Sequence, residues 1–102
     1  MSDDSPVVAT SDLTDAMRDV IAQVLMVPLA SVRLESALVA DLGAESIDFL
    51  DLVFRIEETL ARKIPARRWE EFIDERLPGE YLSRAITTAI VIEFAERERA
   101  RA

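Results

Sequence analysis

Cysteine and histidine are both absent from the 102 residues of this sequence. Without cysteine the chain has no disulfide and no thiolate nucleophile, and without either residue type it lacks the usual zinc ligands. Histidine is also the most common general base, so an enzyme is not expected. Aspartate and glutamate could still act as acids, bases or magnesium ligands, but a chain of this length leaves little volume for the pocket that paired carboxylates require. We therefore predict no catalytic residue and no metal site.

Glycine and long hydrophobic runs are also scarce. Only two glycines occur while half of the residues are hydrophobic, which favours one compact domain with a modest core. No apolar run reaches the length that a bilayer requires, and the first four residues lack the basic start of a secretion signal. We therefore expect a cytoplasmic protein without stable membrane insertion. We also expect a monomer.

Positive charge is in short supply, and the formal net charge is -8. Nucleic acids and anionic membrane surfaces repel such a protein, so basic protein surfaces are the expected partners. The charge is also uneven along the chain, because Arg55 is the only basic residue between Glu35 and Glu58. A basic segment follows directly, and it contains Arg62, Lys63, Arg67 and Arg68.

The start of the chain predicts a leader followed by a helix. Residues 1–10 are small, polar and acidic, which is typical of a flexible leader. Ser11 or Asp12 can cap the helix that follows, and Pro28 ends it. Its apolar residues recur at helical spacing and form one stripe. They are Leu13, Met17, Val20, Ile21 and Val24.

Further helical patterns occupy residues 46–61 and 81–99, with a short amphipathic turn around 69–73. The fold class predicted is therefore all-α, a small bundle of three main helices plus one short helix with a long first loop. Residues 11–95 form the predicted domain, and 96–102 are a solvated, charged helix end or tail.

The long loop at 28–43 carries many apolar side chains, so it should pack across the core. Gly43 supplies the backbone freedom for a tight turn at its end. Ser46 is then placed to cap the second helix. A phosphate ester on a serine at a helix start is stabilised by free backbone amides and by the helix dipole.

The second predicted helix combines a wide apolar face with an acidic ridge. The carboxylates of the ridge are Asp48, Asp51, Glu57 and Glu58. An ordinary solvated helix face would look the same, so the ridge alone does not identify a binding surface. Large aromatic side chains are usually inside a protein, which places Phe54 and Trp69 in the expected core.

The segment around Ser46 resembles a known family. It reads DLGAESID at residues 41–48, and LDLV at 50–53, IEE at 56–58 and IP at 64–65 follow it. Together and in this register, these residues resemble the phosphopantetheine attachment segment of acyl carrier proteins. The resemblance covers residues 13 to about 73 and is looser beyond them.

The resemblance implies that a phosphopantetheinyl transferase moves 4'-phosphopantetheine from coenzyme A to Ser46. The thiol of that arm would hold acyl groups as thioesters for acyl-loading and acyl-processing enzymes. It also implies an acidic surface that meets basic docking patches on these partners, with Phe54 as an apolar contact within it. The acidic residues of that surface are Glu45, Asp48, Asp51, Glu57 and Glu58.

Acyl cargo is expected between the second and last helices, which would part slightly because no preformed cavity is predicted. The expected lining residues are Leu50, Ile56, Ile86 and Ile90, whose stripes should face each other.

Three departures from the family pattern suggest a specialised, stand-alone carrier. Glu45 stands where the family most often has aspartate, and residues 62–69 are basic where housekeeping carriers are acidic. The stretch of residues 72–80 and the long last helix also exceed the usual length. Lipid or polyketide-type synthesis is the expected setting. Two alternatives stay open: an aminoacyl or peptidyl carrier, and an acidic helical interaction module in which Ser46 is only a cap.

Overall fold

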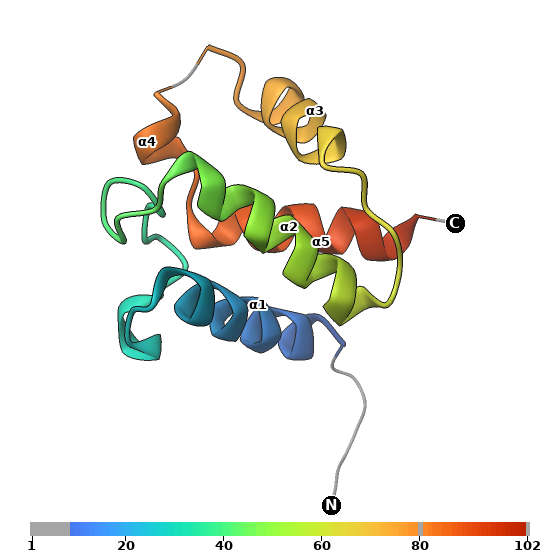
Figure 1. Cartoon of the computed structure of the whole chain (residues 1–102), viewed down its shortest axis with the longest axis horizontal. Coiled ribbons are helices and arrows are strands. Elements are labelled where there is room, and N and C mark those ends of the chain that lie inside the picture. The colour runs from blue at the N-terminus through green and yellow to red at the C-terminus, as the bar shows by residue number, and fades with distance from the viewer. Residues whose placement is uncertain (1–8, 80, 102) are drawn as a thin grey trace, which may run out of the picture.

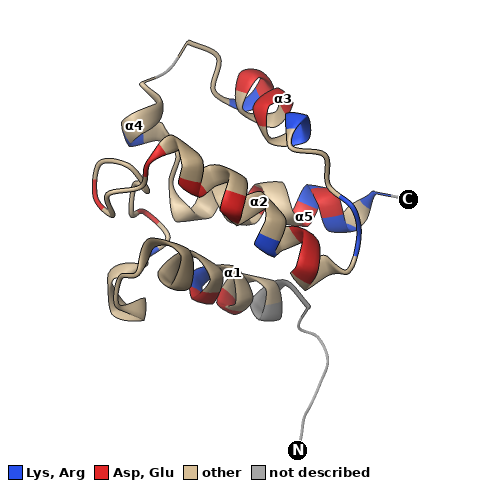
Figure 2. Cartoon of the chain, viewed as in Figure 1, with Lys and Arg blue, Asp and Glu red and all other residues tan. Residues whose placement is uncertain are grey.

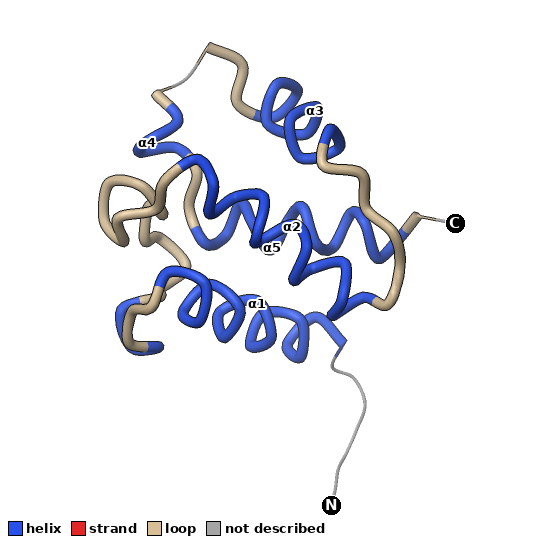
Figure 3. Tube along the Cα trace, viewed as in Figure 1, coloured by secondary structure: helices blue, strands red, loops and turns tan. Residues whose placement is uncertain are grey.

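The structure, a computed structural model, describes residues 9–79 and 81–101, with side chains from Leu13 onward (Figure 1). Its helices are α1 (Ala9–Leu25), α2 (Ser46–Leu60), α3 (Arg67–Arg76), α4 (Leu82–Ala85) and α5 (Thr88–Ala100), with a 3-10 turn η1 (Leu29–Ser31). The described ranges contain helices and loops without a strand, which confirms the all-α bundle (Figure 3). Residues 1–8 of the predicted leader lie outside the described residues.

The core lies where α1 packs against α2 and α5. The apolar stripe predicted in the first helix supplies Leu13, Met17 and Ile21, all of which are buried. Ile56 of α2 and Phe94 of α5 are buried as well. Each such side chain contributes about 1.5–3 kcal/mol by leaving water. The first helix begins at Ala9, so Ser11 and Asp12 lie inside α1 and the predicted cap at these residues is wrong.

The long first loop packs across the core as predicted. Val32 and Leu38 are fully buried within it, although Leu29 and Leu34 are exposed. Arg18 of α1 donates a hydrogen bond from Nε to the Val32 carbonyl at 2.7 Å. These contacts fix the path of the loop toward α2.

The predicted last helix is wrong in one respect, because it is broken between α4 and α5. Ile86 and Thr87 have extended backbone conformations, with ψ angles of 96° and 171°. An antiparallel bridge pairs Thr87 with Ala37 of the first loop, and the Leu38 amide donates to the Ile86 carbonyl at 2.9 Å. The Thr87 hydroxyl then caps α5 by accepting a hydrogen bond from the Ile90 amide. Pairing with the loop therefore replaces one turn of helix.

Side chains, more than backbone proximity, attach α3 to the bundle. Trp69 stacks on Phe49 of α2 with ring centroids 5.6 Å apart, and it meets Phe94 of α5 edge-on at 5.2 Å. Ion pairs add to this contact, and Arg76 binds both carboxylate oxygens of Glu93 at 3.1 and 2.9 Å. The helix therefore leans on α2 and α5 through an aromatic cluster.

The charged end of α5 is not solvated throughout, which corrects the prediction for residues 96–102. Glu98 is 1% exposed, and its carboxylate binds Arg68 at 2.6 Å and Arg101 at 3.0 Å. Arg62 donates to the backbone carbonyls of Glu98 and Arg101. A buried carboxylate of this kind is tolerated only when it is paired. The basic segment after α2 therefore holds the end of the last helix.

Candidate functional site

Ser46 is the first residue of α2 and is exposed. The loop before it is fixed by Gly43, whose φ of 78° is readily adopted by glycine, and by the Ala44 amide, which donates to the Leu38 carbonyl at 2.8 Å. The N-cap residue is Glu45, so the predicted capping role of Ser46 is wrong. No described residue forms a hydrogen bond with the Ser46 hydroxyl, which leaves that group accessible.

Asp48 contributes to the cap at the start of α2, where Glu45 is the N-cap residue. Its Oδ2 atom accepts a hydrogen bond from the Glu45 amide at 2.8 Å, which satisfies a donor at the start of α2. A carboxylate in the first turn also interacts favourably with the positive end of the helix dipole. The Ser46 hydroxyl is consequently free for chemistry, at a helix terminus that stabilises an added phosphate.

The predicted acidic residues differ in their surroundings. Glu45, Asp51 and Glu58 are exposed, and acidic residues follow α2 in Figure 2. Asp48 and Glu57 are half-buried, and Glu57 accepts a hydrogen bond from the Ile64 amide at 2.8 Å. Two of the five carboxylates therefore also hold the backbone, at the two ends of α2.

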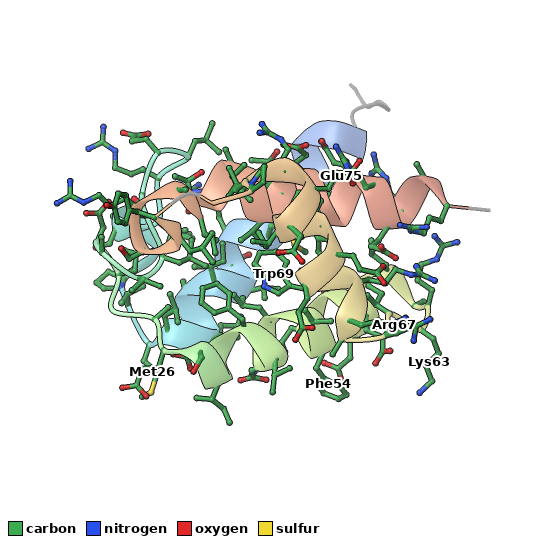
Figure 4. All side chains as sticks on the ribbon, turned by 90° about the horizontal axis from the view of Figure 1, so that it is seen from above. Met26, Phe54, Lys63, Arg67, Trp69 and Glu75 are labelled. Atoms are coloured by element: carbon green, nitrogen blue, oxygen red, sulfur yellow. The ribbon has the colours of Figure 1, made fainter. Side chains whose placement is uncertain are left out.

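The two aromatic residues expected in the core behave differently. Phe54 is 54% exposed, so the expectation of core packing is wrong for this residue. It points away from the bundle in Figure 4, whereas Trp69 points inward. Ile47 and Leu50 are also exposed, at 67% and 56%. Because these three apolar residues lie at positions i, i+3 and i+7 of α2, they form one apolar stripe on its surface.

An open groove of about 700 Å³ begins at Ser46. Residues of the first loop and of α2, α3 and α4 line it, mostly with apolar side chains. They are Val39, Ala44, Ser46, Ile47, Phe49, Leu50, Trp69, Glu70, Ile73, Asp74, Leu82 and Ile86. An apolar groove beside a free serine can shelter a hydrophobic chain attached to that serine.

The groove differs from the predicted acyl site in three ways. It is already open, whereas the sequence-based interpretation expected helices that part to admit cargo. Leu50 and Ile86 line it, but Ile56 and Ile90 do not, and these two belong to the buried core. The wall formed by Trp69 and Ile73 was missed, since a short amphipathic helix does not reveal which neighbour it faces. The aromatic content of α3 was the only available signal.

The part of the chain that is described contains neither a metal-binding cluster nor a membrane-spanning helix. Residues 9–79 and 81–101 contain no group of three or more acidic residues placed to hold a metal ion. None of the helices in those ranges combines the length and the apolar character needed to cross a membrane.

An exposed serine therefore stands at the start of an acidic helix, beside an apolar groove. In comparison with known proteins, residues 15–72 match the family described as "Phosphopantetheine attachment site". The match covers more than half of the chain, and the chain therefore belongs to this family of acyl carrier proteins. Its members are carriers and not enzymes, and they bear covalently attached 4'-phosphopantetheine.

Individual relatives extend the match. The acyl carrier protein AcpXL of Rhizobium etli is 38% identical over 61 residues, which are 60% of this chain and 66% of that protein. AcpXL of Brucella melitensis is 35% identical over 71 residues, covering 69% of this chain and 76% of the relative. The acyl carrier protein of Treponema pallidum is 38% identical over 71 residues, covering 70% and 91% respectively.

Proposed function

We propose that Ser46 is the attachment residue for 4'-phosphopantetheine and that the chain delivers acyl thioesters to enzymes of lipid or polyketide-type biosynthesis in the cytoplasm. The observation that carries this proposal is the exposed Ser46 hydroxyl, which no described residue binds and which opens onto the apolar groove. The geometry fits the arm, because the attached phosphate would lie at the N-terminus of α2. When bound, the arm supplies the thiol that this chain lacks.

Attachment requires one bond to form and one to break. The Ser46 oxygen forms a bond to the phosphorus that carries the pantetheine half of coenzyme A, and the phosphoanhydride bond to the adenosine half breaks. The serine proton must pass to a base, and we assign that base to the transferase because no described side chain forms a hydrogen bond with the Ser46 hydroxyl. Ser46 contributes an unencumbered nucleophile, and α2 contributes a positive helix end that stabilises the product phosphodiester.

The surface of α2 supports a docking role next to the attachment site. Glu45, Asp51 and Glu58 are exposed carboxylates, and Phe54 is an exposed aromatic residue on the same helix. Charged contacts accelerate encounters with basic partners, while an apolar residue among them adds contact area that salt does not screen. This combination favours fast, reversible exchange between a transferase and acyl-processing enzymes. The acidity of α2 favours acyl over aminoacyl or peptidyl cargo.

Intact-mass spectrometry tests the attachment. The purified protein is incubated with coenzyme A and a broad-specificity phosphopantetheinyl transferase. We expect a mass increase of one phosphopantetheinyl group in the wild type and in Ser83→Ala, which removes an exposed serine of α4, but not in Ser46→Ala. An unmodified wild type, or equal modification of Ser46→Ala, would show that Ser46 is not the attachment site. Protein purified from its own cells, analysed before and after mild thioester cleavage, identifies the cargo.

A further inference from the structure

Four basic side chains line a second cleft, of about 300 Å³, without an acidic residue among its lining. They come from the connection between α2 and α3, from the start of α3 and from the residue that follows α5. We call this cleft the basic notch, and it consists of Arg62, Lys63, Arg68 and Arg101. Figure 2 shows these basic segments at the end of the molecule where the C-terminus lies. The notch is unexpected on a chain whose formal net charge is -8.

The three arginines of the notch are held in place by the fold. Arg68 and Arg101 bind the two carboxylate oxygens of buried Glu98, at 2.6 and 3.0 Å. Arg62 donates to the Arg101 carbonyl at 2.9 Å and also to the Glu98 carbonyl. Because a guanidinium has five donors, each arginine keeps donors beyond those that these contacts use. The arrangement is therefore preorganised, which lowers the entropic cost of binding an anion.

Among the described residues, Glu98 is the carboxylate that forms ion pairs with basic side chains of the notch. Glu98 neutralises one positive charge, and the carbonyls at the end of α5 account for the position of Arg62. No described residue pairs with the Lys63 ammonium, which is exposed and points away from the bundle in Figure 4. An ammonium with no structural partner, placed beside three fixed guanidiniums, contributes to ligand binding more readily than to folding.

We propose that the basic notch binds a phosphate group, carried either by a soluble phosphate ester or by an anionic lipid headgroup. A phosphate dianion balances most of the excess charge, and its oxygens match the forked donors of arginine. The cleft, at about 300 Å³, has room for a phosphate group together with hydration waters. The notch lies beyond the end of α2 that is opposite to Ser46, and the 15 residues of α2 span about 22 Å. The notch is therefore independent of the proposed attachment site.

Titration of the ¹⁵N-labelled full chain with inorganic phosphate, at constant ionic strength against chloride, tests the notch by NMR. We expect saturable shifts at the four notch residues, in the wild type and equally in Ser46→Ala. Lys63→Gln should weaken binding about three- to tenfold, because it removes one charge-assisted contact. Arg84→Gln is the matched control, since it removes one exposed positive charge from α4 and should change binding by less than about twofold.

Vesicles distinguish the two sources of phosphate. A lipid headgroup is the ligand if the protein binds phosphatidylglycerol vesicles but not phosphatidylcholine vesicles, and if Lys63→Gln weakens that binding. A response to inorganic phosphate without vesicle binding would assign a soluble ester, which the overall negative charge favours. The proposal fails if neither probe binds, or if Lys63→Gln and Arg84→Gln weaken binding to the same extent.

Discussion

At the scale of single residues, Ser46 and Asp48 lie two residues apart and have different roles at the start of α2. Asp48 closes the start of α2 by accepting the Glu45 amide, and Ser46 keeps its hydroxyl exposed. A serine that served as the N-cap would hold its oxygen against the backbone, where it is a poorer nucleophile. Modification of the Ser46 hydroxyl would therefore leave the hydrogen bond between Asp48 and the Glu45 amide intact.

This division predicts unequal stability effects. Asp48→Ala should lower the free energy of unfolding by about 1 kcal/mol, because it removes a carboxylate that binds the Glu45 amide. Ser46→Ala should stay within about 0.5 kcal/mol of the wild type, since an exposed side chain without a described partner is lost. Urea denaturation followed by circular dichroism measures both. Asp48→Asn, which retains an acceptor oxygen, serves as the control, and a larger loss in Ser46→Ala would contradict this assignment.

At the scale of elements, the proposed docking role of α2 depends on its exposed carboxylates. Because Asp48 also caps the helix, Asp51 and Glu58 are the better residues for a test of electrostatic steering. Reversing both to lysine should slow phosphopantetheinylation at least about threefold in low salt, since steering raises association rates. Added salt should slow the wild type and reduce the difference between the two proteins.

The control for steering is Asp15→Lys combined with Asp19→Lys, which makes the same change in net charge on exposed positions of α1. This double variant should be modified at nearly the wild-type rate. Initial rates by intact-mass spectrometry, over a range of salt concentrations, give the comparison. Equal slowing in both double variants would assign the effect to net charge and remove α2 from the mechanism.

The sequence predicted those elements whose folding depends on local pattern. The apolar stripe of α1 and the position of α2 follow from helical periodicity, and the family motif located Ser46. The break before α5 was missed because it depends on the pairing of Thr87 with Ala37, which lies far away in the sequence. The burial of Glu98 was missed for the same reason, since its partner Arg68 is 30 residues away. Long-range pairing interrupts the helical pattern at Thr87 and buries a charged residue of an intact helix at Glu98.

At the scale of the whole molecule, the groove is lined by residues of the first loop, α2, α3 and α4, which lie far apart in the sequence. If its apolar lining receives the cargo, long acyl forms should melt at a higher temperature than the unloaded holo form. Each buried methylene should add up to about 0.8 kcal/mol to the free energy of unfolding. The gain should rise with chain length until the groove is full. Equal melting temperatures for unloaded, short-chain and long-chain forms would place the cargo in solvent.

Two leucine variants make this test specific. Leu82→Ser changes a partly exposed residue of the groove wall and should reduce the gain in melting temperature for long chains. Leu34→Ser changes a leucine of similar exposure in the first loop, outside the groove, and should leave the gain unchanged. Calorimetry of each variant in unloaded and acylated forms gives both differences. A similar reduction in both variants would contradict the assignment of the groove.

Trp69 gives the groove an optical property of its own. It is the only tryptophan of the chain, it lies in the groove wall, and it stacks on Phe49. Indole emission responds to the polarity of its surroundings. An acyl group that displaces water from this wall would therefore change the fluorescence of the unlabelled protein. If the acyl group enters the groove, the single tryptophan therefore reports the loading state of the carrier in real time, without a dye attached to the cargo.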